Sequence, residues 1–436
     1  MLGLFYFYAM NIDDLYHKFL NSSSVCTDTR KLTQDCMYFA LKGDTFDGNA
    51  FAKNALEEGA KYCVVDDESV VESENYILVD DVLQTLQQLA NYHRKALKIP
   101  IIALTGSNGK TTTKELIHAV LKTSFKVKAT KGNLNNHIGV PLSLLRLEAS
   151  DDYGIIEMGA NHQKEIAFLC TIAEPDYGLI TNFGKAHLEG FGGVEGVIKG
   201  KSELYDHLKA NNKTIFVNTD DATQKIQVGD YTKVISFGSS KTDGISVTHV
   251  SADPFVSVAY EDQTIQSQLI GGYNFGNIAV AIAIGHHFKV SSTDIASAIA
   301  SYNPDNNRSE IIHKGSNKII LDAYNANPSS MLAALQNVLK LEDDAKILFL
   351  GDMFELGAYA EIEHQAIVNF LESNFKGEAH ICGENFYATT VSSEHVHKHQ
   401  SFDSLKNALE LRSIENSTIL IKGSRGMALE RILELL

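Results

Sequence analysis

The chain has 436 residues, of which 44% are hydrophobic and 21% charged, an ordinary composition for a globular protein and too apolar for a disordered one. At roughly 150 residues per domain, this length predicts about three domains. The 54 acidic side chains outnumber the 38 basic ones and give a net charge of −16. That charge argues against general binding to nucleic acid or to an anionic membrane, although it allows a local basic pocket for phosphates.

The cysteine spacing and the apolar start of the chain exclude further classes of protein. The five cysteines form no Cys-x-x-Cys pair, so neither a zinc knuckle nor a disulfide framework is indicated. The opening MLGLFYFYAM is too short for a membrane span and lacks the basic region and cleavage site of a signal peptide. A more ordinary amphipathic segment begins at Met10, so it stays open whether translation starts at Met1 or at Met10. Without an export signal, we expect a cytoplasmic protein.

The first 95 residues differ from the rest in the length of their strands. Short apolar runs (CMYFALKG, YCVVDD and NYILVD) accompany two clear helical patterns. We expect a separate small α/β domain over residues 1–95.

From residue 96 on, strand-length apolar runs alternate with helical patterns. The first series is KIPIIALTG, KTTTKELIHAVLKTSF, DYGIIEMG, QKEIAFLCTIA and YGLITNFG, and a second series follows residue 308. Such alternation predicts βαβ units with parallel sheets, and therefore two nucleotide-fold domains, over 96–307 and 308–436. Between about residues 215 and 272, five short strands predict a mixed or antiparallel extension of the central domain.

The sharpest motif is TGSNGKTT, which lies between an apolar strand and a helical pattern. Its glycines let backbone N–H groups converge on phosphate oxygens, the start of the helix adds partial positive charge, and Lys110 neutralises phosphate charge. Thr111 is a candidate magnesium ligand. Leu104 stands where the strict phosphate-loop consensus has its first glycine, and the plain alternative is a glycine turn with an exposed lysine. No guanine-reading Asn-Lys-x-Asp motif is present, so ATP is favoured over GTP.

Three further residues are candidates for the same chemistry. Glu157 ends an apolar strand, where a carboxylate can hold magnesium directly or through water, or simply cap a helix. His187 lies in a glycine-bordered loop and Lys201 on a predicted helix. Alone, these two would be interpreted as a structural or exposed histidine and a surface lysine.

Taken together, these motifs resemble the Mur ligases, the ATP-dependent amide-forming enzymes that extend the peptide of the cell-wall precursor. The Met-Gly after Glu157 and the YNANP and GDMFELG segments favour the ligase that adds D-alanyl-D-alanine to UDP-N-acetylmuramoyl-tripeptide through an acyl phosphate. The resemblance extends from about Met10 to the end of the chain. It rests on ten ordered segments: 105–115, 131–145, 157–161, 181–193, the helix around Lys201, 271–285, Arg308, 321–331, 351–357 and 422–430.

The resemblance implies a three-domain architecture and a set of nucleotide and metal residues. A small N-terminal α/β domain would bind the UDP-sugar, a central phosphate-loop ATPase domain with a parallel sheet would bind ATP, and a Rossmann-like C-terminal domain would complete the ligase. Lys201 would be carbamylated by CO₂, which turns a cation into a carboxylate-like anion and requires a depressed pKa. Two Mg²⁺ ions would be held, one by Thr111 and Glu157, the other by His187 and Lys201.

The resemblance also implies ATP contacts outside the phosphate loop, between residues 274 and 322. Arg308 resembles the hinge arginine that reaches the γ-phosphate, and Asp322 an acid near the ribose or phosphates, although Leu321 replaces a second acid often found before it. Tyr273 stands where the family usually has histidine. The implied catalytic residues are Lys110, Lys201, His187, Glu157 and Arg308, and the implied ATP contacts are Thr105, Gly106, Ser107, Asn108, Gly109, Lys110, Thr111, Thr112, Asn274, Asn277, Arg308 and Asp322.

The implied substrate residues fall into three groups. Uridine diphosphate would contact Thr27, Asp28, Thr29, Arg30, Lys42 and Gly48; the cleft near the precursor would be lined by Asn133, Asn135 and Asn136; the dipeptide would meet Tyr324, Asn325 and Asn327 and the KGSR segment. We expect a monomer that neither binds nucleic acid nor inserts into a membrane. Lysine and diaminopimelate both remain open as the third residue of the acceptor.

Two further sequence features and two alternative functions remain to be considered: a histidine cluster, an apolar run, a folate-type ligase and a regulatory protein. His395, His397 and His399 alternate and could form a metal face, but their polar neighbours favour a solvated loop or strand edge. The apolar run IAVAIAIGHHF predicts a buried helix. A ligase adding amino acids to folate or another carboxylate is disfavoured by the N-terminal residues and GDMFELG. A nucleotide-dependent regulatory protein without catalysis would not need Glu157, His187 and Lys201 together.

Overall fold

The computed structural model describes residues 11–240, 244–304, 310–342, 345–410 and 412–436. The alternative starts at Met1 and Met10 and the predicted hinge residue Arg308 lie outside the described residues. The chain forms two compact units. The first comprises Met1–Ala103, Phe125–Gly159 and Ala167–Tyr177, and the second Leu104–Ser124, Ala160–Ile166 and Gly178–Leu436.

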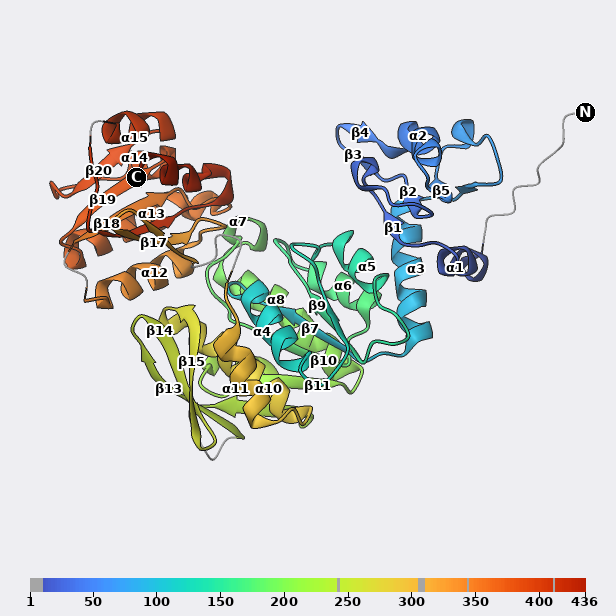
Figure 1. Cartoon of the computed structure of the whole chain (residues 1–436), viewed down its shortest axis with the longest axis horizontal. Coiled ribbons are helices and arrows are strands. Elements are labelled where there is room, and N and C mark those ends of the chain that lie inside the picture. The colour runs from blue at the N-terminus through green and yellow to red at the C-terminus, as the bar shows by residue number, and fades with distance from the viewer. Residues whose placement is uncertain (1–10, 241–243, 305–309, 343–344, 411) are drawn as a thin grey trace, which may run out of the picture. The chain divides into compact units, whose positions relative to one another are not determined.

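The first unit begins with a small parallel sheet and its helices (Figure 1). The strands run in the order β1 (Val25–Cys26), β2 (Met37–Phe39), β5 (Tyr62–Val65) and β6 (Tyr76–Leu78), and every neighbouring pair is parallel. The helices are α1 (Ile12–Leu20), α2 (Ala52–Glu57) and α3 (Val82–Leu97), and β3 (Lys42–Gly43) pairs with β4 (Phe46–Asp47) in a hairpin. Only two helices were expected here, because the six residues of α2 are too few to show helical periodicity.

The helix boundaries of this part follow from local capping. The Asn11 side chain accepts a hydrogen bond from Asp14 N at the start of α1, and Asp81 accepts one from Gln84 N at the start of α3. The helix α3 ends at Leu97, and Lys98, which follows it, has a left-handed φ of 56°. Three of the free cysteines, Cys26, Cys36 and Cys63, are buried in the core between sheet and helices.

The central sheet has nine strands in the order β15-β14-β13-β12-β11-β10-β7-β9-β8. The predicted strands and helices around the phosphate loop are confirmed. The pairs from β11 to β13 are parallel and the pairs from β13 to β15 antiparallel, which confirms the mixed extension predicted from the sequence. The strands are β7 (Ile101–Thr105), β8 (Val127–Ala129), β9 (Tyr153–Glu157), β10 (Tyr177–Ile180), β11 (Thr214–Asn218), β12 (Val234–Gly238), β13 (Ile245–Ala252), β14 (Phe255–Tyr260) and β15 (Gln263–Ile270).

Eight α-helices accompany these strands. They are α4 (Lys110–Leu121), α5 (Gly139–Leu144), α6 (Glu165–Ala173), α7 (Leu188–Phe191), α8 (Val194–Ala210), α9 (Ala222–Val228), α10 (Phe275–His287) and α11 (Ser292–Ser301). In α10 every residue from Asn277 to Gly285 is buried, which confirms the buried helix predicted there. Within the described ranges, no helix has both the length and the apolarity needed to cross a bilayer.

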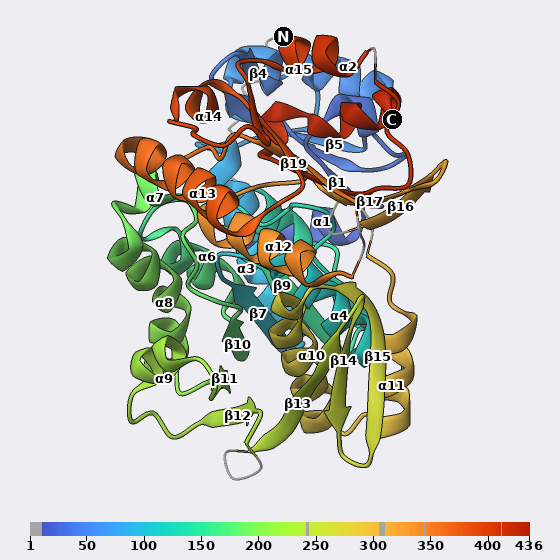
Figure 2. The same ribbon diagram turned by 90° about the vertical axis from the view of Figure 1, so that its left-hand side faces the viewer.

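The last part of the second unit is built on a six-stranded sheet in the order β16-β17-β21-β18-β19-β20. Only the pair β16–β17 is antiparallel; the others are parallel, as the second βαβ series predicted. The strands are β16 (Glu310–Lys314), β17 (Asn317–Asp322), β18 (Lys346–Gly351), β19 (Glu378–Cys382), β20 (Val396–His399) and β21 (Thr418–Lys422). The helices are α12 (Pro328–Lys340), α13 (Ala360–Asn374), α14 (Glu384–Ala388) and α15 (Phe402–Leu409), and α12 and α13 lie side by side (Figure 2).

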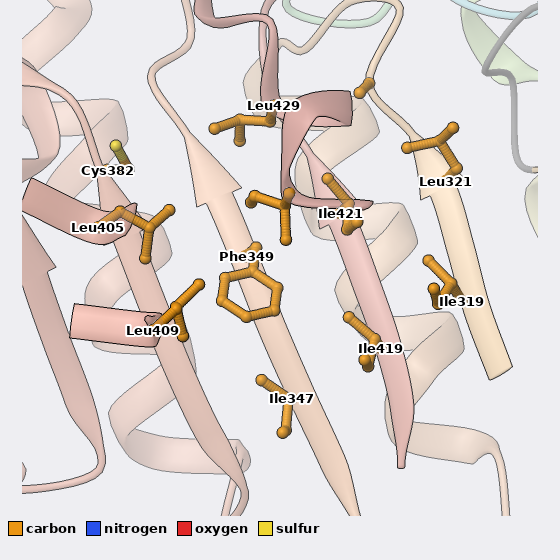
Figure 3. Packing of buried hydrophobic residues seen from close by; sticks show 12 residues of the cluster. Ile319, Leu321, Ile347, Phe349, Cys382, Leu405, Leu409, Ile419, Ile421 and Leu429 are labelled. Carbon is orange, nitrogen blue, oxygen red and sulfur yellow. The ribbon is translucent and has the colours of Figure 1, made fainter. Parts of the chain in front are cut away.

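One face of this sheet carries a closely packed apolar core (Figure 3). Alternate strand residues such as Ile319 and Leu321 point to the same face, as the two-residue period of a strand requires. Phe349 is completely buried among them, and Leu405 and Leu409 of α15 cover it. The sheet therefore holds the ends of β17, β18 and β21 in fixed register.

Candidate active site

The phosphate loop joins β7 to α4 within four residues, and two of them must be glycine. Gly106 has a φ of 141°, and a Cβ there would lie 2.0 Å from Thr181 Oγ1. Gly109 has a φ of 77°, and its Cβ would lie 2.5 Å from the Asn277 Oδ1 atom. Both positions combine a left-handed backbone with close approach of a neighbour, which only glycine tolerates. The strand–loop–helix context predicted from the motif is confirmed.

The positive charge of this loop is concentrated at its centre. Lys110 Nζ donates hydrogen bonds to the carbonyl oxygens of Gly106, at 2.8 Å, and of Ser107, at 3.3 Å. No side chain caps α4, so the positive end of its helix dipole faces the loop. Thr111 and Thr112 lie buried in the first turn. The arrangement is that of an anion-binding loop.

A second loop, which follows β10, holds the phosphate loop in shape. The Asn182 side chain accepts a hydrogen bond from Asn108 N (3.2 Å) and donates one to the Asn108 carbonyl oxygen (3.0 Å). Thr181 Oγ1 donates to the same oxygen at 2.6 Å, and Ser107 Oγ donates to the Gly184 carbonyl oxygen at 2.6 Å. Sequence reasoning singled out this segment but gave Thr181 and Asn182 no role. Their position directly after a buried strand was the available signal.

The two asparagines predicted to contact adenine and ribose are buried beside the loop. Thr113 Oγ1 of α4 donates to Asn277 Oδ1 at 3.0 Å, and Asn277 Nδ2 donates to Asn274 Oδ1 at 2.8 Å. Tyr273 next to them has 41% of its surface exposed. The pair thus links the start of α10 to the helix that begins at the phosphate loop.

Glu157, the predicted magnesium ligand, ends β9 with only 1% of its surface exposed. Its Oε1 atom accepts a hydrogen bond from Asn135 Nδ2 at 2.8 Å, and its N–H donates to Thr130 Oγ1 at 3.0 Å. The Asn135 amide occupies one lone pair of the carboxylate, a group that can also hold a cation. Thr130 was missed by sequence reasoning, because a lone threonine gives no pattern.

The other asparagines of that segment have backbone partners. Asn136 Oδ1 accepts hydrogen bonds from the N–H groups of Ile138 (3.1 Å) and Gly139 (2.9 Å) and so shapes the turn that precedes α5. The Asn133 carbonyl oxygen accepts one from Asn135 N at 2.8 Å.

Lys201 on α8 is completely buried. Its Nζ donates a hydrogen bond to the Ala160 carbonyl oxygen at 2.8 Å and lies 4.8 Å from the centre of the Phe191 ring. Burial, and then the nearby charge of Lys110, lowers the pKa of Lys201 well below its ordinary value. The burial of Lys201 agrees with the depressed pKa that the family resemblance implied.

His187 precedes α7, with a left-handed φ of 52°. Its Nδ1 lies 2.5 Å from Oε2 of Glu355, a residue 168 positions further along the chain. The close contact with His187 lowers the pKa of the Glu355 carboxyl. Glu355 belongs to the GDMFELG segment noted in the sequence, but nothing in the sequence pointed to this partner.

Asp322 and Lys422 face each other at the ends of the neighbouring strands β17 and β21. Lys422 Nζ lies 2.6 Å from Asp322 Oδ2, and the lysine is 1% exposed. The same amine donates to the Asn325 carbonyl oxygen at 3.4 Å. The carboxylate predicted to lie near ATP is thus held by a buried cation.

The predicted dipeptide segment reaches the phosphate loop through one residue. The Asn327 side chain accepts a hydrogen bond from Ser330 N at the start of α12, and its Nδ2 donates to Asn108 Oδ1 at 2.7 Å. Tyr324 lies under the Arg425 guanidinium, at 5.3 Å from ring centre to guanidinium carbon. Asn325 Oδ1 accepts a hydrogen bond from Ala326 N at 2.9 Å.

The predicted uridine-diphosphate residues lie in the first unit. Asp28 caps the short turn that begins at Thr29, and the hydrogen bond from Arg30 lowers the pKa of Asp28 to about 2. Lys42 in β3 pairs with Asp66 at 2.9 Å. Gly48 N donates to the Leu41 carbonyl oxygen at 2.9 Å, and Thr27 adjoins β1. The first unit thus holds these residues in two short, charged turns.

The donors present are suited to Mg²⁺ bound together with a nucleotide. Among the described residues, no three His, Cys, Asp or Glu side chains are grouped so that they could hold a metal ion. Mg²⁺ typically takes one or two protein ligands and completes its shell with phosphate oxygens and water. Thr111 and the buried Glu157 each offer an oxygen donor of the kind that Mg²⁺ prefers, and His187 offers an imidazole nitrogen.

The three alternating histidines lie away from this chemistry. His397 and His399 belong to β20, the last strand in the order of its sheet, as the predicted strand edge required. His399 is nevertheless buried, and its Nε2 lies 2.9 Å from His380 Nδ1 of the neighbouring strand.

Comparisons with known proteins agree with the motifs. Three family models match: the Mur ligase family catalytic domain over residues 22–94, the Mur ligase middle domain over 104–285, and the Mur ligase glutamate ligase domain over 307–425. The UDP-N-acetylmuramoyl-tripeptide–D-alanyl-D-alanine ligase of Bacillus subtilis is 35% identical over 94% of this chain and 92% of its own length.

Solved structures give the same result. The crystal structure of MurF from Acinetobacter baumannii superposes with a TM-score of 0.86 at 28% identity and covers 98% of both chains. MurF from Thermotoga maritima, solved in complex with ADP, superposes with a TM-score of 0.83 at 26% identity and covers 96% of this chain and 97% of that one. The predicted α/β class and three-domain architecture are confirmed. The chain therefore belongs to the Mur ligase family, within which it is similar to the MurF ligases.

Proposed function

We propose that this chain joins D-alanyl-D-alanine to UDP-N-acetylmuramoyl-tripeptide, with cleavage of ATP to ADP and phosphate. The observation that carries this function is a phosphate loop at the start of α4 in a chain that is 35% identical, over nearly its whole length, to a ligase of that name. The product is UDP-N-acetylmuramoyl-pentapeptide, a precursor of peptidoglycan. Neither the folate-type ligase nor the non-catalytic regulator is favoured by any residue of the site.

The chemistry begins with activation of a carboxylate, which is otherwise a poor electrophile. A carboxylate oxygen of the tripeptide attacks the γ-phosphorus of ATP, the bond to ADP breaks, and an acyl phosphate forms. The dipeptide amine then attacks the acyl carbon, loses a proton and displaces phosphate. The main barrier to the first step is repulsion between carboxylate and triphosphate, so oriented positive charge is the chief requirement.

Lys110 and the N–H groups of the loop would supply the fixed part of that charge. We assign ATP phosphates to residues 105–112, the γ-phosphate also to Arg308, and the nucleoside to Asn274, Asn277 and Asp322. Two Mg²⁺ ions, when bound, neutralise the triphosphate and the approaching carboxylate. Thr111 and Glu157 would hold one of them, with Asn135 fixing the Glu157 carboxylate at 2.8 Å.

We assign the second ion to His187 and a carbamylated Lys201. Carbamylation forms an N–C bond between a neutral amine and CO₂ and releases one proton. Burial favours the neutral amine of Lys201, because a charged group loses its hydration there. The modified side chain would present two anionic oxygens in place of a buried amine.

Substrate residues divide between the units. Thr27, Asp28, Thr29, Arg30, Lys42 and Gly48 would bind uridine diphosphate, and Asn133, Asn135 and Asn136 would lie near the precursor. Tyr324, Asn325 and Asn327 would bind the dipeptide. The hydrogen bond from Asn327 to Asn108 supports this last assignment, because it brings the YNANP segment beside the ATP loop.

The proposal also covers the domain boundaries, the oligomeric state and the location of the protein. We place domain boundaries after residues 95 and 307, near the gaps between the three family-model matches. We propose a monomer in the cytoplasm. Five free, buried cysteines support a reducing compartment, where such thiols persist.

A phosphate-release assay tests the function. Purified protein receives ATP, Mg²⁺ and UDP-N-acetylmuramoyl-tripeptide, in separate lysine and diaminopimelate forms, with and without D-alanyl-D-alanine. We expect ADP, phosphate and pentapeptide in equal amounts only in the complete mixture, with the pentapeptide identified by mass spectrometry. Absence of ADP and pentapeptide with both tripeptides would rule the function out.

A further inference from the structure

One glutamate outside the assigned metal residues contacts a proposed cation ligand. Glu355, between β18 and α13, lies with Oε2 at 2.5 Å from Nδ1 of His187. His187 lies in the loop after β10 and Glu355 in the segment after β18, so the two residues are far apart in the sequence of the second unit.

The backbone fixes this contact from both sides. Glu355 has a left-handed φ of 61° and His187 one of 52°, conformations that a non-glycine residue adopts only when its surroundings impose them. In addition, the Glu355 carbonyl oxygen accepts a hydrogen bond from Glu189 N at 3.1 Å. Side chain and main chain of Glu355 therefore engage the same short loop, one residue on either side of Leu188.

An ion pair of this kind contributes little to stability by itself. Half of the Glu355 side chain is exposed, and exposed pairs add little to the free energy of folding. What the contact does determine is which nitrogen of the His187 ring carries the proton. A carboxylate oxygen 2.5 Å from Nδ1 requires the ring proton on that nitrogen, and so fixes the tautomer and leaves the lone pair on Nε2, although Nδ1 lacks the geometry of a regular hydrogen bond.

We propose that Glu355 is a positioning residue for the second cation: its carboxylate holds the Nδ1–H of His187, so that Nε2 is presented to Mg²⁺. The proposal rests on the metal role assigned to His187 above. It gives the GDMFELG segment of the C-terminal part a defined task at the ATP site. Carboxylate partners of metal-binding histidines change metal affinity by roughly 10- to 100-fold when removed.

The test measures cation binding rather than turnover. Mn²⁺ replaces Mg²⁺, and its binding to the full-length protein in the presence of ADP is titrated by electron paramagnetic resonance. The variants are Glu355→Ala, Glu355→Gln, His187→Ala and Glu361→Gln. Glu361, an exposed glutamate at the start of α13, serves as the matched control. Thermal melting confirms that each variant is folded.

We expect Glu355→Ala to weaken binding of one Mn²⁺ by about 10-fold. Glu355→Gln should recover most of that loss, because its amide oxygen still accepts Nδ1–H, and Glu361→Gln should bind as the wild type does. Wild-type binding by Glu355→Ala, or a loss in Glu355→Gln as large as in Glu355→Ala, would overturn the proposal. Unchanged binding by His187→Ala would overturn it together with the metal assignment.

Failure of the proposed function has a different signature. A wild-type protein that forms no pentapeptide refutes the ligase assignment, whatever the Mn²⁺ titrations show. A wild-type protein that forms pentapeptide while Glu355→Ala binds Mn²⁺ normally refutes only the role of Glu355.

Discussion

The Nζ atom of Lys201 lies 2.8 Å from the carbonyl oxygen of Ala160, inside a site that excludes the lysine completely from solvent. A permanently charged lysine would be costly there, because one carbonyl oxygen cannot replace its hydration. The low pKa that burial causes favours the neutral amine, which is the form that the proposed carbamylation by CO₂ requires. The contact therefore connects the packing of α8 to the proposed chemistry.

Lys201→Arg is expected to remove that chemistry. Arginine stays charged and cannot be carbamylated, so kcat should fall at least about 100-fold, the scale of losing one transition-state electrostatic contact. Carbon-13 NMR under labelled CO₂ should show a carbamate in the wild type and none in the variant. A turnover near that of the wild type would contradict the assignment.

Lys110→Ala should abolish turnover without unfolding the protein. Its amine donates to the carbonyl oxygens of Gly106 and Ser107 in its own loop, and each such hydrogen bond contributes only about 1 kcal/mol, so the melting temperature should stay within a few degrees. The affinity for ATP, measured by calorimetry, should fall because phosphate charge is no longer neutralised. Near-normal ligation would count against the phosphate loop as the ATP site.

Asn135→Ala should raise the Mg²⁺ concentration needed for half-maximal activity by about 10-fold, since Glu157 loses the amide that orients it. Asn136→Ala is the matched comparison, because Asn136 hydrogen-bonds the backbone of Ile138 and Gly139 and not the carboxylate. Equal Mg²⁺ requirements in the two variants would contradict this role of Asn135.

Two substitutions at Asn327 separate its structural and functional contacts. Asn327→Ser keeps a hydroxyl that can cap α12 but loses the hydrogen bond to Asn108, whereas Asn327→Ala loses both. Asn327→Ala should lower the free energy of unfolding by about 1 kcal/mol, and Asn327→Ser should lower it much less. Both should raise the KM for D-alanyl-D-alanine, and a normal KM in both would remove Asn327 from the dipeptide site.

The C-terminal part should lose stability in mild acid. Burial lowers the pKa of His380 to about 4 from an ordinary 6.5, and it also lowers the pKa of its neighbour His399. Between those two pH values the unfolded chain binds a proton that folded His380 does not, so stability falls as the pH is lowered through this window. The loss from His380 alone is at most about 3 kcal/mol. Urea unfolding at pH 7 and pH 5 should show a smaller decrease in His380→Gln than in the wild type.

The parts of the fold that sequence reasoning reached are those set by local signals. The strand before Gly106 and the helix after Gly109 follow from hydrophobic periodicity and from the glycines, all within about twenty residues. The six-residue helix α2 left no such period and was missed. The burial of His399 was also missed, since it depends on the neighbouring strand β19 rather than on residues 395–399.

The residues of the site also fall into two groups, those that sequence motifs marked and those whose roles depend on distant contacts. Lys110 could be named because it follows a glycine loop at the start of a recognisable helix, and Glu157 because it ends a recognisable strand. Glu355 and Asn182 could not be given roles, because their partners His187 and Asn108 lie 168 and 74 residues away in the chain. Sequence motifs marked their segments, and only the fold supplied the contacts.

An isotope experiment shows whether ATP activates the tripeptide carboxylate before the amide forms. UDP-N-acetylmuramoyl-tripeptide labelled with oxygen-18 in its terminal carboxylate is ligated to D-alanyl-D-alanine, and the released phosphate is analysed by mass spectrometry. We expect one labelled oxygen in each phosphate, because the carboxylate oxygen that attacks the γ-phosphorus leaves with it. Pentapeptide formed with no label in the phosphate would exclude an acyl phosphate and refute the proposed mechanism.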